Sequence, residues 1–185
     1  MTIPIHAGGL HGTNPASPWL ERWAELLRPG MRALDLACGA GRHVRWLSER
    51  GLHVTAVDRD ATALAEVQAL QRDNDTAIEL LVADLEAGPW PLPERQFDLV
   101  LVTNYLWRPL LPQIVASVAP GGVLIYETFA LGQETVGRPR NPEFLLQPGE
   151  LLDLVRGQLR VIAYEDRQLA APPRFVQRIA ARREA

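Results

Sequence analysis

The 185-residue sequence contains no lysine, and all 19 of its basic residues are arginine. This absence excludes mechanisms that need a lysine, such as a P-loop nucleotide site or a Schiff base. The single cysteine, Cys38, cannot form an internal disulfide, and with only four histidines the sequence shows no metal-ligand spacing, so we expect no metal.

Long apolar runs are also missing. The longest, such as residues 99–102 and 123–126, are far shorter than the ~20 residues that a membrane helix needs. Residues 1–10 lack the basic and apolar segments of a signal peptide. We therefore expect a cytoplasmic protein that has no membrane partner.

There is no excess of positive charge, because 19 basic residues face 22 acidic ones and the net charge is −3. Nucleic-acid-binding domains are usually basic, so the composition argues against a nucleic-acid partner. The length fits one domain over residues 1–185, with residues 1–16 as a loop-like lead-in rich in Gly, Pro and His.

Short apolar strands alternate with helical segments over the first two thirds of the chain. Apolar strands separated by helices indicate βαβ units around a buried parallel sheet. Ser17, followed by Pro18, is placed to cap the first helix. The pattern predicts strands over 32–37, 53–57, 78–82, 97–103 and 123–129, and helices over 17–27, 42–50, 60–70 and 109–118.

The last third of the chain differs from this alternation. Residues 130–147 are predicted to form a long exposed loop, and loops of this length are often lids or binding loops. A helix over 148–156 is followed by strands over 159–164 and 174–180. Only a turn at Pro172 and Pro173 joins these strands, so we expect them to pair antiparallel.

The most informative segment is the glycine loop after the first strand, which contains Gly39, Ala40 and Gly41. Ligands of open α/β sheets bind at such a loop. A dinucleotide site has a third glycine where this sequence has Val44, and the carboxylate of Asp35 would repel a pyrophosphate. Asp35 suits instead a ligand with an ammonium group, such as S-adenosylmethionine, although it could also bond its own loop.

Two further acidic residues follow the next two strands. Asp58 ends the second strand, where a carboxylate accepts hydrogen bonds from both ribose hydroxyls, although it could instead cap a helix. Asp84, with the backbone N–H after it, matches an adenine edge, although aspartate is also a common turn former. Three acidic residues at the ends of successive strands indicate this kind of ligand site more specifically than a pair of glycines alone.

With these residues the sequence resembles the class I S-adenosylmethionine-dependent methyltransferases. Residues 35–41 resemble their first motif, 54–58 their second and 83–85 their adenine-contact segment, and the resemblance covers about residues 31–129. Among the subfamilies, the small tellurite-resistance-type enzymes look nearest. The resemblance implies an α/β doubly wound, seven-stranded sheet of order 3-2-1-4-5-7-6, with strand 7 antiparallel and helices on both faces. It places S-adenosylmethionine at Asp35, Cys38, Gly39, Ala40, Gly41, Asp58, Arg59, Asp84, Leu85 and Asn104.

One departure from the family bears on the methyl acceptor. Nucleic-acid amino-methylases carry two prolines after the fourth strand, whereas residues 104–107 here contain none. We therefore expect methyl transfer to a small molecule by a monomer or weak homodimer. A methyltransferase of RNA or protein, or a non-catalytic module that binds the cofactor, are the alternatives.

Several polar and aromatic residues are candidates for the acceptor side of the site. Tyr105 and Trp107 could wall a pocket, although Trp107 could simply pack beneath a helix. Arg138 and Arg140 could clamp a substrate or be ordinary loop charges. No catalytic base can be named firmly, because an acidic acceptor needs none. The candidates are Tyr105, His43, which could only be packing, and Glu127, which could point into solvent.

Overall fold

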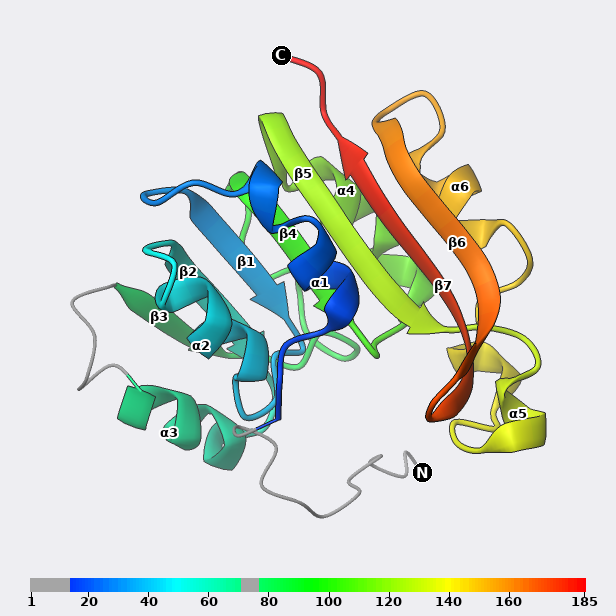
Figure 1. The fold of residues 1–185 in the computed structure, drawn as a ribbon. Helices are drawn as coiled ribbons and strands as arrows, with labels where there is room; N and C mark the ends of the chain where they lie inside the picture. Colours follow the sequence, from blue (N-terminus) through cyan, green and yellow to red (C-terminus); the bar gives the residue numbers. More distant parts are fainter. Residues whose placement is uncertain (1–13, 71–76) are drawn as a thin grey trace.

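The computed structural model describes residues 14–70 and 77–185, and it contains a seven-stranded sheet of order β3-β2-β1-β4-β5-β7-β6 (Figure 1). The predicted lead-in over residues 1–16 lies mostly outside these ranges. The strands are β1 (Arg32–Leu36), β2 (His53–Asp58), β3 (Ile78–Val82), β4 (Phe97–Thr103), β5 (Val118–Phe129), β6 (Arg160–Ala170) and β7 (Pro173–Arg182).

Strands β3, β2, β1, β4 and β5 pair in parallel, and β7 pairs antiparallel with both β5 and β6. A tight turn joins β6 to β7, and strands joined in this way can only run in opposite directions. The predicted strand order and the reversed last strand are thus confirmed. Because β7 runs backwards, its first residues lie at the same edge of the sheet as the last residues of β5.

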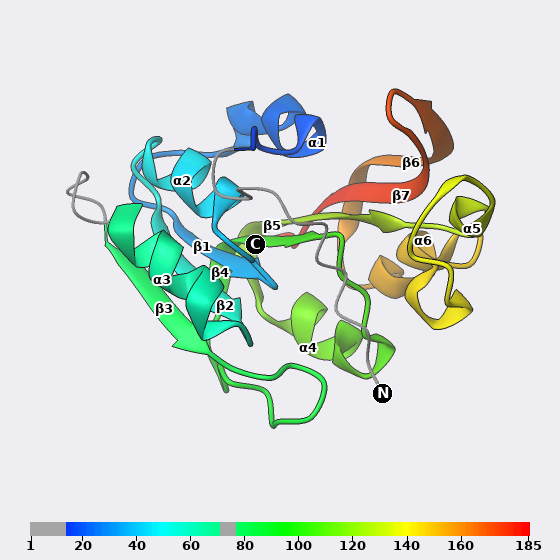
Figure 2. The same cartoon turned by 90° about the horizontal axis from the view of Figure 1, so that it is seen from below.

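Helices cover both faces of the sheet (Figure 2). One hydrophobic core lies beneath α1, α2 and α3 and includes Trp19, Leu47 and Val67. The other lies beneath α4 and α6 and includes Ile114 and Leu151. The helical segments are α1 (Pro18–Arg22), η2 (Ala24–Leu26), α2 (Arg42–Ser48), α3 (Ala61–Leu70), η4 (Arg108–Leu110), α4 (Leu111–Ala116), α5 (Gln133–Val136), η5 (Pro142–Phe144) and α6 (Glu150–Val155).

The first helix begins as its sequence predicts. The Oγ of Ser17 accepts a hydrogen bond from the backbone N–H of Trp19, and Pro18 is the first helical residue. The α-helix ends sooner than expected, at Arg22, and a 3-10 turn continues the path. Serine capping and proline at the first position together fix where the chain enters the helical layer.

Two predictions about the second half of the chain are wrong in part. The helix predicted over 109–118 ends at Ala116, and β5 begins at Val118 instead of 123, with a register shift opposite Phe97 and Leu99. Strand pairing across this irregularity extends the strand through Pro120 and two glycines, because a bulge tolerates residues that a regular ladder does not.

The predicted exposed loop over residues 130–147 is also partly wrong. It contains α5 and η5, and Gln133, Leu145 and Leu146 are buried within it. Ala130 and Leu146 form an isolated bridge that closes the segment on itself. Side chains that pack inward, rather than glycine and proline content, decide how this segment folds.

Candidate functional site

The glycine loop connects β1 to α2 with three residues in the left-handed region: Ala37 (φ 54°), Gly39 (φ 55°) and Gly41 (φ 80°). At Gly41 a Cβ atom would lie 2.6 Å from Cγ2 of Val67, a residue of α3. Glycine is therefore required there both by its backbone angle and by the close approach of α3. The loop leaves the sheet at the carboxyl edge, where ligands of open α/β sheets bind.

Asp58, at the end of β2, holds this loop in place. Its Oδ2 accepts a hydrogen bond from the N–H of Gly39 at 2.8 Å, and its Oδ1 accepts one from the N–H of Asp60 at 2.9 Å. The backbone N–H of Cys38 also donates to the carbonyl of Val57. Each carboxylate oxygen of Asp58 retains a second lone pair that can accept a ligand hydroxyl.

Asp35 is the most unusual residue of the site. Its side chain on β1 is only 1% exposed, and neither carboxylate oxygen has a hydrogen-bond partner among the described residues. Burial, partly offset by Arg42 and reinforced by Asp58, raises the pKa of Asp35 to about 8. Buried carboxylates without partners are rare and costly in folded proteins, so this one calls for an explanation.

An ammonium group supplies that explanation, because it would donate hydrogen bonds to both oxygens and compensate the buried charge. The α-ammonium of S-adenosylmethionine is such a group. A Cβ atom at Gly39 of this loop would meet nothing within 4 Å, so a ligand can approach the loop backbone closely there. The residues present therefore fit the cofactor that the sequence predicted.

The remaining predicted cofactor residues lie near this edge, but some already have other partners. Oδ1 of Asp84 accepts hydrogen bonds from the N–H groups of Glu86 and Ala87, which lowers the pKa of Asp84. Asp84 thus forms the turn considered as its alternative role, and it is exposed, as Arg59 is. Leu85 is buried in the core beneath.

Cys38 is buried, and its Sγ lies 3.5 Å from the carbonyl oxygen of Gly39. Burial, together with Asp35 and Asp58, raises the pKa of the thiol far above its ordinary value. A thiol held neutral in this way is a packing residue, since only the thiolate is a nucleophile.

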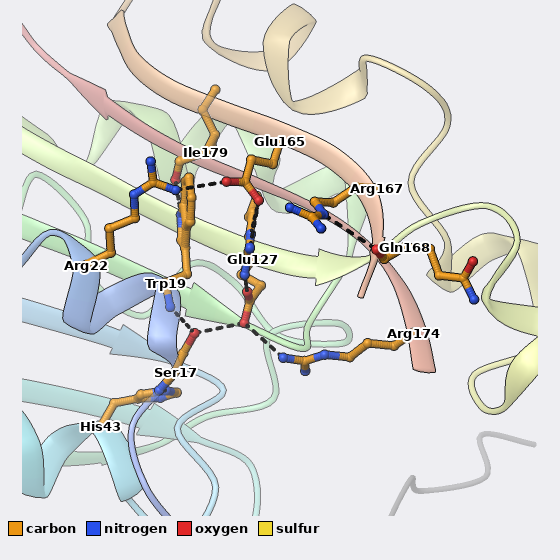
Figure 3. Close-up of polar contacts among 11 residues, drawn as sticks. Ser17, Trp19, Arg22, His43, Glu127, Glu165, Arg167, Gln168, Arg174 and Ile179 are labelled. Atoms are coloured by element: carbon orange, nitrogen blue, oxygen red, sulfur yellow. Dashed lines mark hydrogen bonds and ion pairs between the residues drawn. The ribbon is translucent and has the colours of Figure 1, made fainter. Parts of the chain in front are cut away.

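A buried polar network lies beside the glycine loop (Figure 3). Nε2 of His43 accepts a hydrogen bond from the backbone N–H of Ser17 at 3.2 Å, and Nδ1 lies 3.5 Å from Oγ1 of Thr103. The hydroxyl of Ser17 donates to Oε1 of Glu127 at 2.9 Å. Desolvation, together with Arg42, lowers the pKa of His43 to about 3, so its ring is neutral.

Glu127 therefore does not point into solvent, which was one of the two alternatives considered for it. It is 1% exposed, and its Oε2 accepts a hydrogen bond from Arg178 at 3.2 Å. Arg178 also binds Glu165 of β6 at 2.6 Å, and Glu165 in turn binds Arg22 at 2.9 Å. The network thus ties α1 to the last three strands of the sheet.

The residues after β4 follow the carboxyl end of that strand, at the same edge of the sheet as the glycine loop. Asn104 is exposed with φ 54°, and its N–H donates to the carbonyl of Glu127. Tyr105 is half-buried, its hydroxyl has no partner among the described residues, and burial raises its pKa. Trp107 packs against the core that contains α4, as its alternative role required. The hydroxyl of Tyr126 donates to the carbonyl of Tyr105 and fixes this turn.

Arginines near residues 130–147 differ in their role. Arg108 forms a two-point ion pair with Glu150, at 2.8 and 2.9 Å, and also donates to the carbonyls of Glu143 and Leu145. This guanidinium is fully committed to the fold. Arg138 and Arg140, which were predicted to contact substrate, are both exposed.

Sequence reasoning missed four residues that shape this edge: Thr103, Arg42, Arg174 and Arg178. Ser17 was identified only as a helix cap, yet it links His43 to Glu127. Its second role depends on a contact across 110 positions of the chain, for which the sequence contains no signal.

Within residues 14–70 and 77–185, no group of three His, Cys, Asp or Glu side chains is arranged to hold a metal ion. In the same ranges, none of the helices has both the length and the apolar character needed to span a membrane.

The sheet order and the acidic residues around the glycine loop define a class I S-adenosylmethionine-binding fold. Comparison with known proteins agrees, because residues 33–122 match the family described as methyltransferase domain. The chain therefore carries a domain of the class I S-adenosylmethionine-dependent methyltransferase family.

Two relatives of known name are a methyltransferase and a carboxymethyltransferase. The chain is 34% identical over 109 residues to malonyl-[acyl-carrier protein] O-methyltransferase of Serratia marcescens, covering 56% of this chain and 40% of that protein. It is 31% identical over 137 residues to tRNA U34 carboxymethyltransferase of Pseudoalteromonas translucida, covering 66% and 41%. The chain thus spans about two fifths of the length of these relatives.

The crystal structure of TehB from Haemophilus influenzae has the same fold, with a TM-score of 0.72 at 20% identity. The match covers 90% of this chain and 61% of TehB.

Proposed function

We propose that this protein binds S-adenosylmethionine and transfers its methyl group to a small-molecule acceptor. The observation that carries the proposal is the Asp35 carboxylate, which is buried and unpartnered beside the glycine loop. No pyrophosphate would be tolerated there at close range, whereas an ammonium group would be stabilised.

Three parts of the cofactor have a counterpart on this edge of the sheet. Asp35 receives the α-ammonium, and Asp58 receives the ribose hydroxyls while it holds Gly39. Oδ1 of Asp84 holds the turn, so its Oδ2, together with the N–H of Leu85, is the group that meets the adenine edge. The cofactor supplies an activated methyl group on a sulfonium, and the protein orients the acceptor and excludes water.

Methyl transfer proceeds without a protein base in this proposal. His43 is neutral with both ring nitrogens engaged, and burial raises the pKa of Tyr105, so neither group takes a proton readily at neutral pH. Glu127 is occupied by Ser17 and Arg178. The acceptor atom is then one that is already nucleophilic, such as a carboxylate, a thiolate or an enolate.

Residues 130–147 were expected to form a lid over the acceptor. Their contacts with the rest of the fold limit how much of this segment can move. The side chain of Gln133 accepts from the N–H of Phe175 in β7, and the other end of the segment is held by Arg108. The side-chain amide of Gln133 also donates to the carbonyl of Arg138, so only the exposed residues 140–142 lie free between these anchors and are available to close over an acceptor. Removal of residues 140–142 should lower turnover more than cofactor affinity.

RNA is the second candidate acceptor, because one relative is a tRNA-modifying enzyme. The net charge of −3 and the commitment of Arg108 to Glu150 favour the small molecule, since phosphate binding uses clustered free cations. Labelled S-adenosylmethionine, supplied with either a metabolite mixture or total RNA, separates the two. Label in the small-molecule fraction supports the proposal. Salt-sensitive RNA binding together with label in the RNA would refute it, and the Asp35→Asn variant is the negative control.

A further inference from the structure

Arg174, the second residue of β7, has unused hydrogen-bonding capacity. Its side chain is 23% exposed, and its Nε is buried without a partner among the described residues. Its nearest carboxylate oxygen, Oε1 of Glu127, lies 4.0 Å from Nη2, which is beyond hydrogen-bond distance. A guanidinium has five N–H donors in a fixed fork, and none of those of Arg174 has a hydrogen-bond acceptor among the described residues.

Arg42, at the start of α2, supplies a second positive charge. Its guanidinium forms no hydrogen bond or ion pair within the part of the chain that the structure describes. Its electrostatic neighbours are Asp35, Glu127 and Arg174. It therefore lies between the predicted cofactor site and the start of β7.

The local charge is not balanced. Arg22 and Arg178 share Glu165, and Arg178 and Arg174 share Glu127. With Arg42 added, four arginines face two glutamates, so this cluster has two positive charges in excess. The amino-acid end of the cofactor carries one ammonium and one carboxylate and adds no net charge, so an ionised Asp35 beside Arg42 lowers this excess to one positive charge.

The cluster lies where an acceptor has to bind. Because β7 is antiparallel to β5, Arg174 is close to the carboxyl end of β5 and not at the opposite edge of the sheet. Its side chain extends from β7 toward Glu127, on the side of the sheet that also carries Ser17 and His43 (Figure 3). The glycine loop opens at this edge as well.

We propose that Arg174, assisted by Arg42, binds an oxyanion group of the methyl acceptor, so that the substrate is a small carboxylate or phosphate compound. This inference rests on the proposed function and names its substrate class. Glu127 acts as a positioning residue that holds Arg178 and leaves the fork of Arg174 free. A guanidinium fork matches a carboxylate or phosphate at two points, which selects such acceptors over neutral ones.

The test measures binding of two probes, malonate and inorganic phosphate, to the protein saturated with S-adenosylhomocysteine. We expect both anions to bind the wild-type protein at millimolar concentrations. Arg174→Gln and Arg42→Gln should each weaken that binding by at least about tenfold, and Arg174→Lys should lie between. Arg156→Gln, which removes an exposed arginine at the end of α6, is the matched control and should bind both anions normally.

S-adenosylhomocysteine affinity, measured in the same variants, separates a failure of the proposed anion site from a failure of the proposed cofactor site. Normal cofactor binding with lost anion binding in Arg174→Gln supports the inference. Anion binding that is absent in the wild type, or equal in Arg174→Gln and wild type, overturns it and leaves the proposed function standing. A wild-type protein that fails to bind S-adenosylhomocysteine overturns both.

Discussion

Cofactor binding should release a proton from Asp35. Burial raises the pKa of this carboxyl to about 8, so at pH 7 the free protein holds it about nine-tenths protonated. An ammonium group stabilises only the ionised form. Binding of S-adenosylhomocysteine, which keeps the α-ammonium, should therefore expel about 0.9 proton per site at pH 7. Its apparent affinity should fall about tenfold for each pH unit below 8.

Titration calorimetry measures this directly. Heats recorded at pH 7 in HEPES and in Tris, whose ionisation enthalpies differ, give the number of protons released. Asp35→Asn is the control, because its amide cannot titrate, and it should bind more weakly with no buffer dependence. Equal heats for the wild-type protein in the two buffers, or an affinity that does not change between pH 6 and pH 8, would refute the assignment of Asp35 to the ammonium.

Three further predictions concern the loop and the buried histidine. Gly41→Ala should lower the free energy of unfolding by about 1–3 kcal/mol in urea titrations, because its Cβ would meet Val67, whereas Gly39→Ala, in open space, should cost only about 1 kcal/mol. Since the pKa of His43 is lowered to about 3, the unfolded chain binds the extra proton below pH ~6.5, and stability should fall as the pH drops from there, with a slope that approaches about 1.4 kcal/mol per pH unit near pH 5. His43→Asn should remove that part of the slope, and an unchanged slope would contradict the burial argument. Asp58→Ala should weaken S-adenosylhomocysteine binding by at least about tenfold in calorimetry, and unchanged affinity would exclude a ribose contact.

The core strands could be read from the sequence because their pattern is local. The predicted bounds of β3 and β4 coincide with those observed, since each is a short apolar run between turn residues. The glycine loop, Asp35 and Asp58 were found for a related reason. Each of them comes directly at or after the end of a strand, so their place at the carboxyl edge follows from the parallel βαβ pattern alone.

Only the tertiary structure decided which charges meet. Ser17 and Glu127 are 110 positions apart, and Arg174 is 47 positions from Glu127, so no local pattern links them. The antiparallel register of β7 determines that Arg174 and Arg178 face Glu127. The same holds for residues 130–147, whose glycines and prolines indicated an exposed loop. Buried Leu145 and Leu146 anchor them instead, because burial depends on neighbours that the sequence does not specify.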